Sequence, residues 1–268
     1  MNHSDTGRCH ALSIAGSDSC GGAGIQADIK AINSLGVEAA SVLTAVTAQN
    51  TRGVSAVTVL EADMVQAQLE AVLEELPIAA TKTGMLANAE IIERVADTIV
   101  KARSMALVID PVMVATSGAR LLSVDAEQAL RDRLLPLAGL VTPNRPEAAV
   151  LTGLDASAPA EELAAALLEL GCRAVLVKGG HGGGEVVEDL LAIGEQRLMF
   201  RHPRLPASVH GTGCALSAAI TAKLALGQPL EVAVESGIAW LQARLAGCWK
   251  AAGGQLSMLP FSGAMAQG

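Results

Sequence analysis

Short apolar runs alternate with longer amphipathic segments along most of the chain. The runs are rich in Val, Ile and Ala, and in the segments between them apolar residues recur every three or four positions. The pattern predicts strands at 11–16, 39–50, 78–84, 106–113, 139–144 and 173–180, and helices at 24–36, 64–76, 90–102, 126–137 and 160–171. Such alternation is typical of a parallel sheet covered by helices on both faces, so the predicted fold class is α/β.

The last third of the chain departs from this alternation. Two neighbouring strand-like runs at 185–194 and 196–201 predict a hairpin at the edge of the sheet, and 229–253 predicts a last long helix. No linker, repeat or low-complexity tract divides the 268 residues. We therefore expect one domain over 11–262, preceded by a flexible segment at 1–10.

Composition excludes several classes of partner. The net charge of −8 disfavours nucleic acid and anionic membranes, which need a basic surface. The polar start predicts no signal peptide, and no apolar run is long enough to cross a membrane. The five cysteines form no C-x-x-C pair, which favours a reducing compartment, so we expect a cytoplasmic protein. With 1% aromatic residues, a substrate pocket must be built from aliphatic side chains and Met.

Glycines and polar residues gather just after the predicted strands. In open parallel sheets, ligands bind at the carboxyl ends of the strands. The segments concerned are GSDSCGGAG (16–24), AQNT (48–51), KTGM (82–85), DPVM (110–113), TPNRPE (142–147), KGGH (178–181) and HGTGC (210–214). Their shared position predicts a ligand site at this edge.

The segment at 210–214 predicts a tight bend that opens a helix. Gly211, Thr212 and Gly213 bring free N–H groups together, and the Ala- and Leu-rich residues that follow favour a helix. A helix start carries about half a positive charge, so it binds phosphate and lowers the pKa of a nearby thiol. Cys214 is therefore either a reactive thiol or an ordinary packed cysteine.

Other strand-end residues also allow a structural and a functional interpretation. Asn144 and Glu147 have the spacing of a helix capping box, yet Glu147 could also lie beside hydrated magnesium. Asp110 is a turn former or an acceptor for metal-bound water, and Lys178 is a solvated lysine or a phosphate-neutralising one. Gln49 is an ordinary strand-end amide or a reader of a heteroaromatic edge.

The first loop contains a further glycine motif. Gly22, Gly24 and Ala27 fit a relaxed dinucleotide fingerprint, but they do not open directly from the preceding strand, so an NAD enzyme is disfavoured. No P-loop sequence occurs. His181 and His210 are predicted to form hydrogen bonds in loops rather than to bind metal, because no other His or Cys stands at metal-ligand spacing.

Taken together, the motifs resemble the hydroxymethylpyrimidine/phosphomethylpyrimidine kinases of the ribokinase-like superfamily. The resemblance runs from ALSIAGSDSCGGAGIQADIKA through TAQNTRGV, KTGML, DPVMVATSG, TPNRPEA and VKGGH to HGTGCALSAAI, nearly the whole chain. It implies a single-domain three-layer α/β/α sandwich with a central, mostly parallel sheet and no separate β lid. It also implies an ATP- and Mg²⁺-dependent kinase of thiamine biosynthesis that phosphorylates 4-amino-5-hydroxymethyl-2-methylpyrimidine and then the monophosphate.

The resemblance also assigns roles to residues. It implies that Asp110 and Glu147 serve Mg²⁺, and that Lys178, Asn144 and Thr212 hold ATP phosphates. The implied anion hole and catalytic base are Gly211, Thr212, Gly213 and Cys214. The implied substrate-binding residues are Gln49, Asp28, Gly16, Ala23, Met85 and Val112. Departures from the usual family pattern occur at Ser19, Cys20, Thr116 and Ala215.

Rival functions remain open at this point. A pyridoxal-type kinase would use the same constellation on another hydroxymethyl heterocycle, and a non-catalytic regulator would bind nucleotide without turnover. The resemblance also implies a homodimer.

The implied base, Cys214, can be neutral. A neutral base suits an enzyme that must also bind a phosphorylated substrate, because a permanently charged carboxylate would repel the phosphate.

Overall fold

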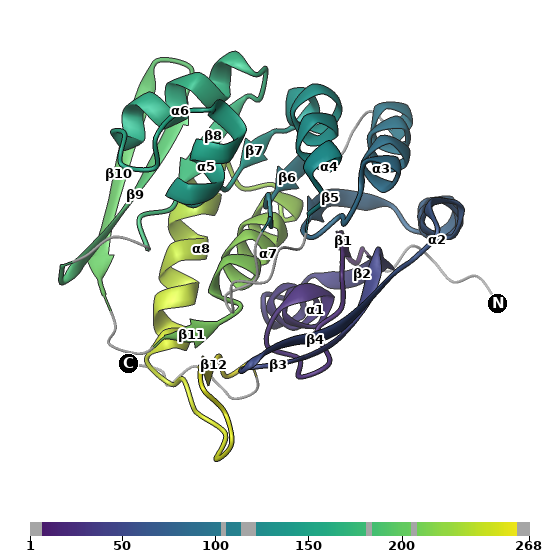
Figure 1. The fold of residues 1–268 in the computed structure, drawn as a ribbon, viewed down its shortest axis with the longest axis horizontal. Coiled ribbons are helices and arrows are strands. Elements are labelled where there is room, and N and C mark those ends of the chain that lie inside the picture. Colours follow the sequence, from purple (N-terminus) through teal and green to yellow (C-terminus); the bar gives the residue numbers. More distant parts are fainter. Residues whose placement is uncertain (1–6, 103–105, 114–121, 181–183, 205–207, 262–268) are drawn as a thin grey trace.

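The computed structural model describes residues 7–102, 106–113, 122–180, 184–204 and 208–261. Its centre is an eight-stranded sheet of order β10-β9-β8-β7-β6-β5-β1-β2, in which every pair is parallel except β8–β9 and β9–β10 (Figure 1). The strands are β1 (His10–Ala15), β2 (Glu38–Leu43), β5 (Ile78–Thr83), β6 (Ala106–Ile109), β7 (Leu140–Val141), β8 (Ala174–Val177), β9 (Val186–Ile193) and β10 (Gln196–Pro203). The predicted α/β class and the hairpin at the sheet edge are confirmed.

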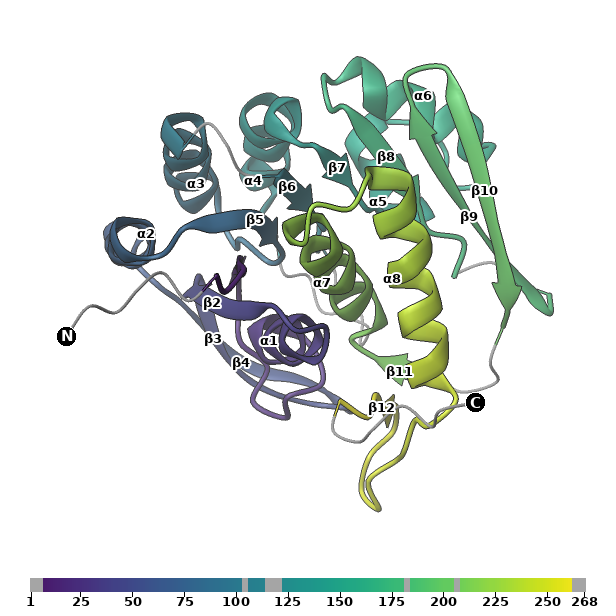
Figure 2. The same ribbon diagram turned by 180° about the vertical axis from the view of Figure 1, so that it is seen from behind.

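Helices cover both faces of the sheet. One face carries α2 (Ala62–Glu75), α3 (Ala89–Ala102), α4 (Val124–Ala129) with the turns that continue it to Leu137, α5 (Arg145–Thr152) and α6 (Ala160–Glu169). The other face carries α1 (Gly24–Ser34), α7 (Thr212–Ala225) and α8 (Leu230–Leu245), with α7 between α1 and α8 (Figure 2).

Alternate strand residues feed two separate apolar cores. Leu107 and Ile109 face the α2–α6 side, whereas Val108 faces α7 and α8. Successive side chains of a strand point to opposite faces, so a continuous apolar run is what a sheet covered on both sides requires. The three-layer sandwich is therefore confirmed.

The predicted strand 39–50 is wrong as a single element. It breaks at Thr44 into β2 and β3 (Ala45–Asn50), and β3 pairs antiparallel with β4 (Gly53–Val59) in a two-stranded hairpin outside the central sheet. Its neighbour β1 ends at Ala15, opposite Leu43, so the residues beyond have no strand to pair with in the central sheet. This hairpin is a short excursion between β2 and α2 and not an inserted lid domain.

The C-terminal prediction also needs correction. The last helix, α8, ends at Leu245, well before residue 253, and Gly247, Gly253 and Gly254 follow it. Glycine is a poor helix former, and the chain instead reaches β12 (Ser257–Met258), which pairs in parallel with β11 (Val209–His210). Residues 1–6 and residue 262 lie outside the described residues, so the expected flexibility of 1–10 stays a prediction. No described helix is both long and apolar enough to cross a membrane.

Candidate active site

A cavity of about 920 Å³ opens at the carboxyl ends of the parallel strands. It is lined by every residue that the sequence analysis assigned to the site except Asp28: Gly16, Ala23, Gln49, Met85, Asp110, Val112, Asn144, Glu147, Lys178, Gly211, Thr212, Gly213 and Cys214. These residues come from seven segments that are far apart in sequence. The clustering predicted from strand ends is therefore confirmed as geometry.

The bend before α7 forms one wall of the cavity. Gly211 has φ of +76°, and a Cβ there would overlap the carbonyl oxygen of Gly22, so only glycine fits this close approach to the first loop. Thr212 begins α7 and Cys214 lies in its first turn. The predicted glycine bend leading into a helix is confirmed.

The expected low pKa of Cys214 is not what the structure supports. Burial raises the pKa of this thiol to about 11, and although the Lys82 ammonium lowers it, Asp28 and Asp110 add to the rise. Desolvation of the thiolate therefore outweighs the helix start and the nearby cation. In the free protein Cys214 is a neutral thiol.

A buried ion pair lies beside this helix start. Lys178 Nζ donates to Asp110 Oδ1 at 2.9 Å, and the other Asp110 oxygen accepts from Ser217 Oγ at 3.2 Å. A Cβ on Gly213 would lie 3.2 Å from Lys178 Nζ, so the ammonium group borders the bend. Burial opposes ionisation of Asp110, but the Lys178 charge lowers its pKa below the usual value. The site thus holds a fixed cation and a fixed anion next to free helix N–H groups.

Asn144 and Glu147 form the predicted capping box and also line the cavity. Asn144 Oδ1 accepts from the Glu147 N–H, and Glu147 Oε2 accepts from the Asn144 N–H, both at 2.8 Å, which completes a capping box at the start of α5. Both residues also line the cavity. Burial raises the pKa of Glu147 to about 7, partly offset by Lys178.

Asp28 lies behind the cavity wall, where it pairs with Lys82. Lys82 Nζ donates to the two carboxylate oxygens at 3.0 and 2.8 Å, Ser13 Oγ donates at 2.6 Å, and the Lys82 and Asp28 side chains are both fully buried. Lys82 itself lines the cavity, and the Asp28 charge raises its pKa despite burial. Lys82 was not among the predicted site residues, although its place in KTGM, one residue before the end of β5, was a usable signal.

Gln49, Met85 and Val112 lie at another part of the cavity. Met85 packs with Ala45 and Ala87 in a small apolar cluster, and Val112 packs against it. Gln49 lies near the end of β3, as the prediction of a strand-end amide requires. That strand belongs to the β3–β4 hairpin, however, whereas the prediction placed it in the central sheet. This region offers aliphatic faces and one amide, and the aromatic-poor sequence predicted such a pocket.

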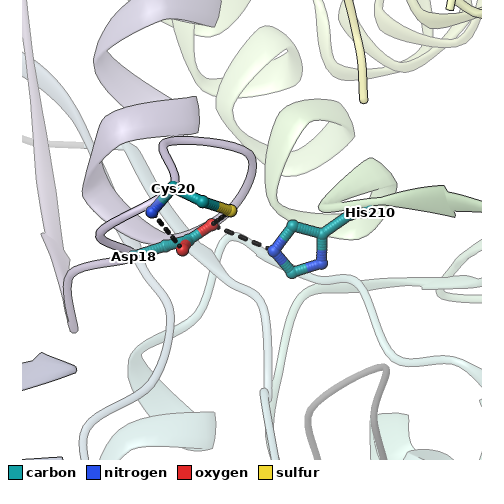
Figure 3. Close-up of side chains that lie close together, drawn as sticks. All are labelled: Asp18, Cys20 and His210. Carbon is teal, nitrogen blue, oxygen red and sulfur yellow. Dashed lines mark hydrogen bonds and ion pairs between the residues drawn. The ribbon is translucent and has the colours of Figure 1, made fainter. Parts of the chain in front are cut away.

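Asp18, Cys20 and His210 also meet at the site, contrary to the expectation that His210 has no metal-type neighbours (Figure 3). His210 Nε2 lies 2.9 Å from Asp18 Oδ2, across 192 positions of sequence. The Asp18 carboxylate also accepts N–H groups of Cys20, Gly22 and Ala23 at 2.8 to 3.0 Å. Its oxygens are thus already occupied by donors. His210 forms hydrogen bonds, as predicted, while His181 and Thr116 lie outside the described residues.

Comparison with known proteins agrees with this geometry. A family model described as phosphomethylpyrimidine kinase matches residues 18–258. The chain is 49% identical over 239 residues to the hydroxymethylpyrimidine/phosphomethylpyrimidine kinase of Rhizobium meliloti, covering 88% of this chain and 90% of that protein. It is 44% identical to the Escherichia coli protein of the same name, covering 89% and 91%.

Solved structures give the same result. The phosphomethylpyrimidine kinase of Clostridium difficile superposes with a TM-score of 0.78 at 40% identity, covering 88% of this chain and 98% of that one. The ADP complex of Bacillus subtilis pyridoxal kinase superposes with a TM-score of 0.87 at 33% identity, covering 95% and 98%. The chain is therefore a phosphotransferase that belongs to the phosphomethylpyrimidine kinase family.

Proposed function

We propose that this protein transfers the γ-phosphoryl group of ATP to the hydroxymethyl oxygen of 4-amino-5-hydroxymethyl-2-methylpyrimidine, and then phosphorylates the monophosphate to the diphosphate. One observation carries the proposal. The Cys214 thiol, the bend before α7 and the Lys178–Asp110 pair line the same cavity as the Gln49 amide and the Met85 side chain. Substrate alcohol and nucleotide phosphates can therefore meet in one enclosed space.

The substrate ring is proposed to lie between Met85 and Val112, with its polar edge on Gln49. An amide offers one donor and one acceptor direction, which suits the alternating donors and acceptors of an aminopyrimidine. Gly16 and Ala23 border the same region, and a Cβ on Gly16 would lie 3.0 Å from the Met85 sulfur, so glycine there lets the Met85 side chain keep its place beside the proposed ring site. Asp28 would act through Lys82, since it does not reach the cavity.

The phosphates are proposed to lie on Lys178, Asn144 and Thr212, with Mg²⁺ held by Asp110 and Glu147. Asp110 and Glu147, two buried carboxyl groups beside a lysine, are oxygen ligands of the kind that Mg²⁺ takes. An ion held there would supply charge neutralisation during phosphoryl transfer. The free N–H groups of Gly211, Thr212 and Gly213 stabilise the charge of the migrating group.

Cys214 is proposed as the base of the first transfer. Its sulfur takes the proton of the hydroxymethyl oxygen, and the adjacent Lys82 ammonium favours the thiolate this requires. The monophosphate needs no deprotonation, since it carries about −1.5 to −2 charges near neutral pH. For that substrate the neutral thiol avoids repulsion.

The test is purified protein with ATP, Mg²⁺ and the pyrimidine alcohol, followed by mass spectrometry for the mono- and diphosphate. We expect both products, and loss of both in Lys178→Met. ATP hydrolysis without a phosphorylated pyrimidine would refute the proposed function.

Pyridoxal phosphorylation is the second candidate function. It is favoured by one observation, the close superposition on the Bacillus subtilis pyridoxal kinase. Parallel kcat/KM measurements with pyridoxal and the pyrimidine alcohol separate the two, and we expect the pyrimidine to be the better substrate because the higher sequence identities are to the pyrimidine kinases.

We further propose a cytoplasmic homodimer with small-molecule partners alone. Val46, Val57 and Val59 of the β3–β4 hairpin are 48%, 43% and 40% exposed, and such apolar exposure on a short two-stranded sheet suits burial against a second copy. Sedimentation equilibrium of the wild type and of Val57→Lys tests the dimer. A wild type that sediments as a monomer at micromolar concentration would refute it.

A further inference from the structure

Both oxygens of the buried Asp18 carboxylate accept hydrogen bonds. Its oxygens take the N–H groups of Cys20, Gly22 and Ala23, and the side chain is 1% exposed. Burial would raise the pKa of Asp18, but the hydrogen bonds from His210, from the Cys20 side chain and from the Ala23 N–H lower it to about 2. The group is therefore an ionised acceptor with no proton to give.

This fixes the proton on His210. Nε2 lies 2.9 Å from Asp18 Oδ2, so it must donate, and Nε2 carries the hydrogen. The other ring nitrogen, Nδ1, is buried, has no hydrogen-bond partner among the residues that the structure describes, and points away from the carboxylate (Figure 3). Gly22 is what admits the ring, because a Cβ there would lie 2.7 Å from His210 Cδ2.

The proton on Nε2 in turn decides how Gln49 must point. The Gln49 amide nitrogen is 3.3 Å from His210 Nε2 and its oxygen is 3.3 Å from Thr47 Oγ1. In this orientation the Gln49 amide nitrogen and the His210 Nε2–H are both donors and cannot bond to each other. The Thr47 hydroxyl gives its own proton to Ser17 O at 2.8 Å, so it can only accept from Gln49. Turning the amide by 180° removes this clash. The amide nitrogen then donates to Thr47 Oγ1, and the amide oxygen faces the single Nε2–H of His210, which is shared between Asp18 and Gln49.

We propose that Asp18 and His210 are positioning residues that lock the Gln49 amide in this turned orientation. The inference rests on the proposed function, in which Gln49 reads the edge of the substrate ring. With one rotamer locked, the amide presents a fixed donor and a fixed acceptor to the cavity, and rings with the opposite pattern are rejected.

Two variants of His210 form a matched pair. The amide nitrogen of Gln in His210→Gln occupies the place of Nε2 and keeps the donor, whereas the nitrogen of Asn in His210→Asn occupies the place of Nδ1 and loses it. We expect His210→Asn to raise KM for the pyrimidine alcohol about tenfold, as for one lost buried hydrogen bond, with KM for ATP within about twofold of wild type. His210→Gln restores the wild-type KM. Equal rises in both KM values, or no rescue by Gln, would overturn the proposal.

A measurement on the wild-type protein does not depend on activity. Nitrogen-15 NMR of histidine-labelled protein reports which ring nitrogen carries hydrogen, and the His210 signals are identified by their loss in His210→Gln. We expect hydrogen on Nε2 in the absence of substrate. A bare Nε2 would refute the dyad even if the kinase activity is as proposed. Absence of pyrimidine phosphorylation with the expected tautomer would instead refute the function and leave the dyad standing.

Discussion

The high pKa of Cys214 gives the two phosphoryl transfers different pH dependences. On the proposed mechanism the first transfer needs the thiolate, and burial raises the thiol pKa to about 11. At pH 8 only about one molecule in a thousand then carries the thiolate, and this fraction rises about tenfold with each pH unit. The second transfer needs no base, because the phosphate of its substrate is already ionised above pH 7.5.

The assay is kcat for each substrate alone, with saturating ATP and Mg²⁺, between pH 7.5 and 9.5. This window lies above the pKa of Glu147, which burial raises to about 7, so that group is mostly ionised throughout and its own titration changes kcat by less than about twofold. We expect kcat to rise about a hundredfold with the alcohol and less than about twofold with the monophosphate. Two profiles that rise together, or two flat profiles, would refute the assignment of Cys214 as base.

Replacing the thiol with a permanent anion tests the same reasoning from the other direction. Cys214→Asp introduces a carboxylate next to the incoming phosphate, and unit charges about 4 Å apart interact by roughly 4 kcal/mol at an effective dielectric constant near 20. We therefore expect the second transfer to lose much more rate than the first. Cys214→Ser, which is neutral and of similar size, is the control and should not show this bias. Equal losses in both steps of Cys214→Asp would contradict the charge argument.

Two further predictions concern the buried charges. Lys82→Met leaves the fully buried Asp28 carboxylate unpaired and should lower the free energy of unfolding in urea by about 3–5 kcal/mol, whereas Lys82→Met combined with Asp28→Asn should recover at least half of that loss. If the losses of unfolding free energy in Lys82→Met and in Asp28→Asn simply add up in the double variant, the broken ion pair is not the cause of the loss in Lys82→Met. Lys178→Met removes the cation paired with Asp110 and should raise the dissociation constant for ATP about tenfold or more in calorimetry. The pyrimidine alcohol should bind it as before, and equal weakening of both ligands would argue against the phosphate role.

Much of the fold follows from local pattern. The continuous apolar runs at Leu107–Ile109 and Ala174–Val177 are what strands covered on both faces require, and both are central strands. The capping box at Asn144 and Glu147 was readable because its two partners are three residues apart. The glycine bend at Gly211 was equally local.

The predictions that were wrong depended on contacts between distant parts of the chain. Nothing within 39–50 shows that its pairing partner ends at Ala15, so the break at Thr44 was invisible to a local pattern. The pKa of Cys214 depends on how completely other elements exclude water from the sulfur, which helix position alone does not reveal.

The sequence by itself determined the fold class, the family and the edge of the sheet at which the site lies, because strand periodicity and turn residues act over a few positions. Only the tertiary structure decided that Asp28 serves Lys82, 54 positions away, and that Asp18 holds His210, 192 positions away. Such contacts form where segments that are distant in sequence meet beside the ends of the parallel strands. The protonation state of a group there depends on its neighbours in space and not on its neighbours in sequence.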